Sequence, residues 1–229
     1  MTPAQPQPRT VLVDSFVLAG GRSSRMGSDK ALLEIDGRPL IAIALERLRA
    51  AGTNPRICGS RPDLAHFAPA LPDRFPNAGP LAGLEAALAA SGSELSLFLP
   101  VDLPALPADF LRWLLARAQA STALATIPWF AGRAQPLCAV YSRQLLPGIR
   151  DSLQAGQFKV LAAIQLAATS LGQRIDAFQV ESVASALPPG RWPAFPPPYR
   201  WFRNLNSPFD FQILQHELAS GAKSDHPIS

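Results

Sequence analysis

Cysteine, histidine and methionine are scarce in this chain, whose 229 residues include 2, 3 and 2 of them. Cys58 and Cys138 stand far apart in apolar, strand-like surroundings. We therefore expect two buried, reduced thiols and neither a disulfide nor a metal-binding pair. The three histidines show no spacing typical of metal ligands. These scarcities argue against a disulfide-stapled secreted fold and favour a cytoplasmic protein.

Long apolar runs and blocks of one charge are also missing. No apolar run approaches the roughly 20 residues that a membrane helix needs. The opening residues 1–9 are rich in Pro and Gln and lack the apolar core of a signal peptide. The net charge of +4 comes from arginines scattered along the chain, without a basic block or interleaved aromatics. We therefore expect no membrane partner and no nucleic-acid partner.

The composition is that of a globular protein with a sizeable core, with 48% hydrophobic and 17% charged residues. A chain of this length can form one large domain. We predict a single domain over residues 11–220, between a disordered tail at 1–10 and a C-terminal tail at 221–229.

Strand-like and helical segments alternate along this domain. Such alternation is typical of an α/β fold, with a mostly parallel sheet and helices on both faces. The proline-rich stretch 187–199 fits neither a regular helix nor a central strand. Strands are predicted at 11–18, 32–35, 55–58, 95–99, 123–127, 136–141 and 175–180, with a further short segment at 71–73. Helices are predicted after Pro39, Gly83 and Pro107, near 145–153, at 159–168, and after Pro208.

A glycine-rich stretch directly follows the first predicted strand. Gly20 and Gly21 allow the backbone to come close to a ligand, and successive free N–H groups in such a turn suit anionic oxygens. Arg25 and Lys30 add two cations to the same stretch. Neither the P-loop string nor the dinucleotide string occurs here. The stretch still predicts a cradle for a triphosphate.

Two aspartates follow other predicted strands. In open α/β sheets, ligands bind beyond the carboxyl ends of the strands, where Asp73 and Asp102 are expected. A lone aspartate after a strand is more often a turn or cap residue, but Asp102 lies between two prolines on the side of the phosphate cradle. Mg²⁺ prefers one or two carboxylates together with phosphate oxygens. Asp102 is therefore the predicted metal ligand and Mg²⁺ the predicted cofactor.

Several motifs, taken in their order along the chain, are typical of a known protein family. The string L-A-G-G-x-x-x-R-M-G-x-D-K at 18–30, G-P-L-A-G at 79–83, D-L-P from Asp102, Q-P-L from Gln135 and N-L-N-S-P-F-D at 204–210 occur in this order. Together they resemble the nucleotidyltransferase superfamily that includes the molybdenum cofactor guanylyltransferases, the bacterial molybdopterin-guanine dinucleotide synthases. The resemblance implies a Rossmann-like nucleotidyltransferase fold, GTP and Mg²⁺ as ligands, and molybdopterin as the acceptor.

The resemblance also assigns residues to the expected reaction. A terminal phosphate oxygen of molybdopterin would attack the α-phosphorus of GTP, and pyrophosphate would leave without a covalent enzyme intermediate. Arg25, Lys30 and Asp102 are the expected catalytic residues. Lys159 fits either the pterin phosphate or a solvated helix start. The expected nucleotide and cofactor contacts are Leu18, Ala19, Gly20, Gly21, Lys30, Asp73 and Gly79, with Asn204 and Asn206 on the pterin or metal side.

The chain departs from the family pattern in two segments. At 59–61 only Arg61 is kept from the family's Ala-Asn-Arg, where the resemblance implies a contact with the base. The stretch 187–199 looks like an insertion, and we expect a surface loop that packs Trp192, Phe195 and Trp201 on the domain.

Several functions remain open at this point. A cytidylyltransferase acting on the same cofactor or a sugar-phosphate nucleotidylyltransferase would use the same chemistry with different pockets. A non-catalytic nucleotide-binding or assembly protein is the alternative outside the enzymes, supported by the altered segment at 59–61. Cofactor-insertion proteins are further candidate partners.

Overall fold

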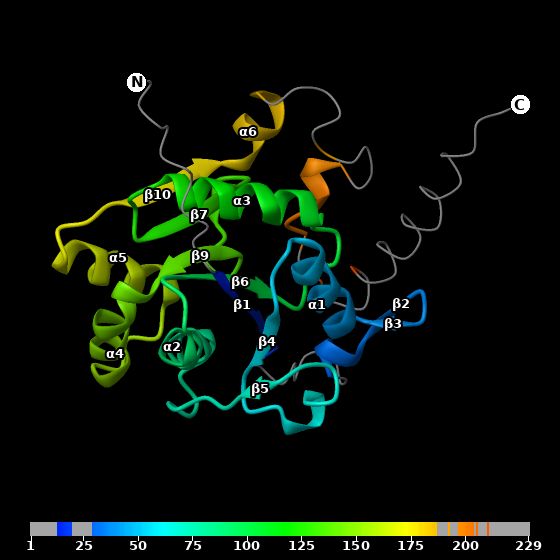
Figure 1. Ribbon diagram of the computed structural model, residues 1–229, viewed down its shortest axis with the longest axis horizontal. Helices are drawn as coiled ribbons and strands as arrows, with labels where there is room; N and C mark the ends of the chain where they lie inside the picture. The colour runs from blue at the N-terminus through cyan, green and yellow to red at the C-terminus, as the bar shows by residue number, and fades with distance from the viewer. Residues whose placement is uncertain are drawn as a thin grey trace, which may run out of the picture.

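The computed structural model describes residues 13–19, 29–186, 192, 197–203, 205 and 210. Its strands form one large sheet and one small hairpin (Figure 1). The large sheet contains β1 (Val13–Leu18), β4 (Pro55–Cys58), β5 (Ala70–Leu71), β6 (Leu95–Pro100), β7 (Ala125–Phe130), β8 (Arg133–Ala134), β9 (Ala139–Ser142) and β10 (Ile175–Gln179), while β2 (Glu34–Ile35) and β3 (Arg38–Pro39) form the hairpin.

The helices predicted within the described residues are present with small shifts at their ends, whereas α6 (Val180–Ala186) is a further helix that the sequence does not predict. Lys159 is the residue before α5 rather than its first residue. The described helices are α1 (Leu40–Ala50), α2 (Pro80–Ala90), α3 (Ala108–Ala120), α4 (Leu146–Gln154), α5 (Val160–Ser170) and α6 (Val180–Ala186), with short 3-10 turns η1 (Lys30–Leu32), η2 (Pro62–Leu64), η3 (Arg143–Leu145) and η4 (Pro198–Arg200).

The strand order in the large sheet is β10-β7-β9-β6-β1-β4-β5, with β8 paired to β7. The neighbours from β5 to β6 run parallel, as do β10 and β7, which confirms the predicted mostly parallel sheet. The exceptions are the short β8, which is antiparallel to β7, and β9, which is antiparallel to β6 and to β7. The connection from β7 to β9 contains only the short β8, and a parallel crossover needs a dozen or more residues.

Several predicted strand ends shift in the structure, among them both ends of β7, which is predicted at 123–127. The strand expected from residue 136 begins only at Ala139, because the Cys138 N–H donates to the Gln135 carbonyl 3.0 Å away and closes a turn. At the other end of the chain, Val180 starts α6 instead of ending β10. The start of β9 differs by three residues beside a turn and the end of β10 by one residue at a helix start, and sequence patterns locate such boundaries poorly.

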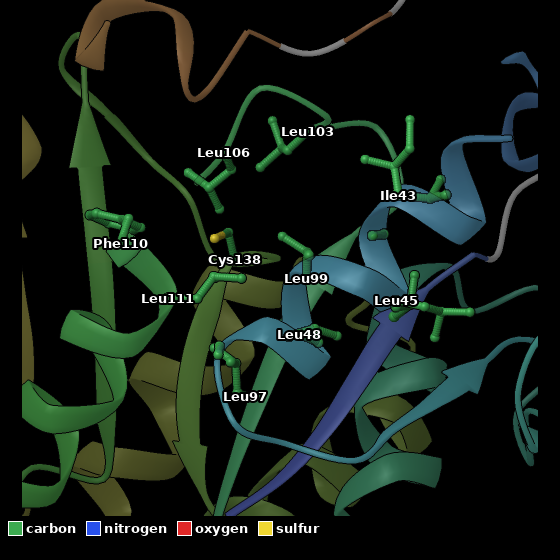
Figure 2. Close-up of a cluster of buried hydrophobic side chains, with 14 of the residues drawn as sticks. Ile43, Leu45, Leu48, Leu97, Leu99, Leu103, Leu106, Phe110, Leu111 and Cys138 are labelled. Atoms are coloured by element: carbon green, nitrogen blue, oxygen red, sulfur yellow. The ribbon is translucent and has the colours of Figure 1, made fainter. Parts of the chain in front are cut away.

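Alternate side chains of the central strands enter two separate cores, one on each face of the sheet. Leu97 and Leu99 of β6 belong to the core under α1 and α3, whereas Phe98 belongs to the core under α2, α4 and α5. Figure 2 shows the first core, where leucines of α1 and β6 meet Phe110 and Leu111 of α3. Helices therefore cover both faces, as the sequence predicts.

Both cysteines are free and buried, at the end of β4 and just before β9. Burial raises the pKa of each thiol well above its ordinary value. Among the described helices, none has both the length and the apolar character needed to cross a membrane.

An aromatic cluster on α3 holds the described part of the proline-rich segment. The ring centroids of Trp192 and Trp201 lie 5.2 Å apart, and that of Trp201 lies 5.3 Å from Phe110. This confirms the packing predicted for these two tryptophans. Phe195, the tails and nearly all of the helix predicted after Pro208 lie outside the described residues.

Candidate functional site

Four strands end together at one edge of the sheet. Leu71 of β5 pairs with Cys58 of β4, Cys58 pairs with Leu18 of β1, and Leu18 pairs with Pro100 of β6. Because these strands are parallel, their carboxyl ends form a single row. The loops that follow them carry Asp73, Arg61, Ala19 and Asp102 in the same order. The topology thus gathers residues that are far apart in the sequence.

Lys30 and Asp102 meet at this edge. The Lys30 Nζ lies 2.7 Å from the Asp102 Oδ2, across 72 residues of sequence. Their side chains are 17% and 18% exposed, so the pair is largely shielded from water. An electrostatic interaction is stronger in such surroundings than in bulk solvent. The fold therefore brings the predicted cation and the predicted carboxylate into direct contact at this edge.

The position of Lys30 depends on Asp29. Asp29 precedes η1, and its Oδ1 accepts a hydrogen bond from the Ala31 N–H at 3.0 Å. This cap fixes the first turn of η1, in which Lys30 is the first residue.

Arg61 joins Asp29 from the turn after β4. Its Nη1 lies 3.1 Å from the Asp29 Oδ1, and its Nη2 also donates to that carboxylate. Neither Asp29 nor Arg61 is among the site residues predicted from the sequence. The signal was available, because Asp29 stands in the glycine-rich string and Arg61 is the one residue kept from its family segment.

One carboxylate oxygen of Asp73 is buried without a hydrogen-bond partner among the described residues. Its backbone N–H donates to the Ser60 Oγ at 3.4 Å, but its buried Oδ1 has no hydrogen-bond partner among the described residues. Burial raises the pKa of Asp73 above its ordinary value. An unpartnered polar atom of this kind is expensive unless a ligand or water completes it. Among the described residues at this edge, the Asp73 Oδ1 is therefore the atom best placed to accept a hydrogen bond from a ligand.

Two glycines bring α2 close to the strand ends. Gly79 precedes α2 with φ 65° and ψ −153°, a conformation essentially restricted to glycine. A Cβ added at Gly83 would lie 3.3 Å from the Leu18 Cδ2 and 3.7 Å from the Asp73 Oδ1. The G-P-L-A-G motif therefore lets the first turn of α2 pack against β1 and the Asp73 loop.

The last motif also reaches this edge. The Leu205 N–H donates to the Asp102 carbonyl 3.4 Å away, and Leu205 is fully buried. Leu205 stands between Asn204 and Asn206 in the sequence. These two asparagines lie outside the described residues, as do Gly20, Gly21 and Arg25.

The predicted Mg²⁺ fits the donors that are present. No group of three or more His, Cys, Asp or Glu suited to a metal occurs within the described segments. Mg²⁺ is commonly held by one or two carboxylates with substrate phosphates completing its shell. The partly exposed Asp102 carboxylate beside Lys30 meets that requirement. Lys159 is exposed directly before α5.

Comparison with known proteins agrees with this architecture. The family model of the MobA-like NTP transferase domain matches residues 15–169. The molybdenum cofactor guanylyltransferase of Syntrophotalea carbinolica is 30% identical over 200 residues, which cover 86% of this chain and 88% of that protein. The probable molybdenum cofactor guanylyltransferase of Methanothermobacter thermautotrophicus is 31% identical over 213 residues, covering 86% and 96%.

Solved structures share the fold. The crystal structure of molybdopterin-guanine dinucleotide biosynthesis protein A from Archaeoglobus fulgidus superposes with a TM-score of 0.73 at 21% identity. The match covers 90% of this chain and 99% of the archaeal one. At this level of identity the likeness establishes the fold.

Proposed function

Because this chain belongs to the family of MobA-like NTP transferase domains, we propose that it transfers GMP from GTP to molybdopterin. The products are the guanine dinucleotide form of the cofactor and pyrophosphate. Membership of the family makes the protein a nucleotidyltransferase. The names of the relatives from Syntrophotalea and Methanothermobacter support GTP as the donor and molybdopterin as the acceptor.

The contact between Lys30 and Asp102 carries the proposal. In-line transfer requires neutralisation of charge on the triphosphate more than it requires covalent chemistry. In the proposed complex Lys30 and Arg25 stabilise the charge that develops as the bond between the α-phosphorus and the bridging oxygen breaks. The leaving group is pyrophosphate, and the attacking atom is a terminal phosphate oxygen of molybdopterin.

Asp102 is the proposed ligand of Mg²⁺. When bound, the ion supplies a positive charge next to the phosphate oxygens. Leu18, Ala19, Gly20 and Gly21 would place their backbone along the nucleotide.

Asp73 is suited to the nucleoside, because its buried Oδ1 needs a donor. Gly79 is the proposed nucleotide contact before α2, and Gly83 lets α2 lie close to that oxygen. Asn204 and Asn206 are proposed for the pterin or metal side.

Pyrophosphate release tests the reaction directly. We expect release with GTP and Mg²⁺ only when molybdopterin is present, and little release with ATP, CTP or UTP. Asp102→Asn and Lys30→Gln should each lower the rate on the order of a hundredfold, the usual effect of losing one preorganised contact. Arg38→Gln serves as the control, because the Arg38–Glu46 pair is exposed and belongs to β3 and α1.

Other outcomes of this assay would indicate a different reaction. Release with CTP and molybdopterin identifies a cytidylyltransferase, and release with a sugar phosphate identifies a nucleotidylyltransferase of that class. Nucleotide binding that survives Asp102→Asn, with no pyrophosphate from any acceptor, contradicts catalysis. A cytoplasmic location and an interaction with cofactor-insertion proteins stay predictions, which fractionation and co-purification test.

A further inference from the structure

Arg61 makes charged and polar contacts to several segments at the site edge. Its guanidinium contacts two carboxylates and one carbonyl, and its side chain is only 13% exposed. On one side it holds Asp63 of η2, with the Nε at 2.9 Å from Oδ1 and the Nη2 at 2.6 Å from Oδ2. The hydrogen bonds that Arg61 donates to Asp63 and Asp29 raise the pKa of its guanidinium, so it stays charged.

On its other side Arg61 reaches two residues that bracket the glycine-rich stretch. Its Nη1 lies 3.4 Å from the Ala19 carbonyl oxygen and 3.1 Å from the Asp29 Oδ1. Ala19 is the last described residue before residues 20–28, and Asp29 is the first after them. One planar group therefore fixes both flanks of that stretch.

The end of β4 also forms a backbone hydrogen bond with Ala19. The Ala19 N–H donates to the Cys58 carbonyl at 3.1 Å, three residues before Arg61. Both polar backbone groups of Ala19 are thus bonded to the end of β4 or the turn after it. Arg61 is held in this turn by its own N–H, which donates to the Gly59 carbonyl at 2.8 Å.

Asp29 connects Arg61 to the turn that carries Lys30. A single oxygen, the Asp29 Oδ1, accepts hydrogen bonds from both Arg61 and the Ala31 N–H. If Arg61 is lost, Asp29 keeps its cap on η1 but is no longer tied to β4. Lys30, the next residue, must reach Asp102 from that cap.

We propose that Arg61 is a positioning residue for nucleotidyl transfer, whose guanidinium fixes Ala19 and Asp29 and so sets the place of Lys30 beside Asp102. The inference rests on the proposed function, but it concerns a residue that need not touch GTP. It also gives a physical reason for keeping an arginine in a segment that otherwise departs from the family pattern. A lysine offers a single ammonium group and cannot form the same fork.

The test compares Arg61→Gln, Arg61→Lys, Asp29→Asn and the double variant Arg61→Gln/Asp29→Asn. Each is measured for kcat and KM in pyrophosphate release, for GTP·Mg²⁺ binding by calorimetry, and for Tm. We expect each single variant to lower kcat/KM about tenfold or more, with Lys failing to rescue, and the double variant to lose no more than Arg61→Gln alone. Tm should change by no more than a few degrees.

Arg112→Gln is the matched control. Arg112 also joins a carboxylate, that of Asp109, to a carbonyl of another segment, Ala50, but it lies on α3 and is half exposed. This variant and Asp63→Asn should keep kcat/KM within about twofold of the wild type. Both leave the contacts of Arg61 to Ala19 and Asp29 in place.

Two results would overturn the inference. Losses that add in the double variant, or a fully active Arg61→Lys, would mean that Arg61 acts as a simple charge on the nucleotide. A fall in activity only in proportion to a large fall in Tm would mean a general structural role. If the wild type releases no pyrophosphate at all, the proposed function fails, while the calorimetric comparison of GTP·Mg²⁺ affinities still decides the role of Arg61.

Discussion

Single residues at the site edge differ in how their charges are satisfied. Lys30 and Asp102 neutralise each other, and Arg61 is shared by Asp29 and Asp63. Asp73 is different, because its buried Oδ1 has no partner among the described residues. A carboxylate held in this way lowers the stability of the fold and is retained where a ligand needs it.

The Asp73→Asn variant is expected to be more stable and less active. Burial raises the pKa of Asp73, so the ionised group costs stability once the pH exceeds its unfolded value of about 3.9, and the cost vanishes below that pH. The Tm of Asp73→Asn should therefore exceed that of the wild type at pH 7, and the difference should close as the pH falls to about 4. GTP binding should weaken in the same variant.

Asp63→Asn is expected to change the stability at pH 7 in the opposite direction. The hydrogen bond from Arg61 lowers the pKa of the Asp63 carboxyl, so its contribution is present at pH 7 and lost in acid. Its substitution should lower Tm slightly at pH 7. A Tm for Asp73→Asn at or below the wild-type value at pH 7 would contradict the account of Asp73.

At the scale of elements, α2 is fixed on one side by glycines and on the other by a buried charge. Glu85 of α2 is fully buried, and its Oε1 lies 2.7 Å from the Arg150 Nε of α4 and 3.4 Å from the Arg74 Nη2. Its Oε2 has no partner among the described residues. Arg74 follows Asp73 directly, so this charge cluster connects α4, α2 and the loop at the site.

Removing Arg150 should expose the cost of the buried Glu85. We expect Arg150→Met to lower the free energy of unfolding by about 3 kcal/mol, because among the described residues it leaves the buried carboxylate with only the exposed Arg74, 3.4 Å away, as its partner. The double variant Arg150→Met/Glu85→Leu should recover most of this loss. Denaturant unfolding measures both, with Arg38→Met as an exposed-pair control that changes little. Equal losses in the single and double variants would refute this role of Glu85.

At the scale of the whole molecule, the site lies where β5, β4, β1 and β6 end together, with helices on both faces of the sheet. α1 follows β1 on one face and α2 leads into β6 on the other, so the chain changes direction across the sheet between β1 and β6 (Figure 1). Open α/β sheets bind ligands at such switch points.

Ligand binding there should stabilise the entire fold. At about 100 times its Kd, GTP·Mg²⁺ is expected to add about 2.7 kcal/mol, which corresponds to a rise in Tm of about 5–10 °C for a chain of this size. Mg²⁺ should enlarge the shift in the wild type but not in Asp102→Asn. Thermal unfolding with and without Mg²⁺ checks this, and an equal Mg²⁺ effect in both proteins would remove Asp102 from the metal site.

The sequence by itself determined the alternation of strands and helices, the mostly parallel sheet, and the approach of Lys30 to Asp102. These follow from local patterns and from the rule that parallel strands end at a common edge. Strand ends beside turns, such as the start of β9 at Ala139, were less well determined, because competing backbone hydrogen bonds decide them.

Only the tertiary structure decided the antiparallel place of β9, the burial of Glu85 and the role we propose for Arg61. Each depends on contacts between segments far apart in the sequence: 32 residues separate Arg61 from Asp29, and 65 separate Arg150 from Glu85. Residue types and spacing reveal that a cation is available. Which carboxylate or carbonyl it meets is fixed only when the strands take their register and the helices pack on the two faces of the sheet.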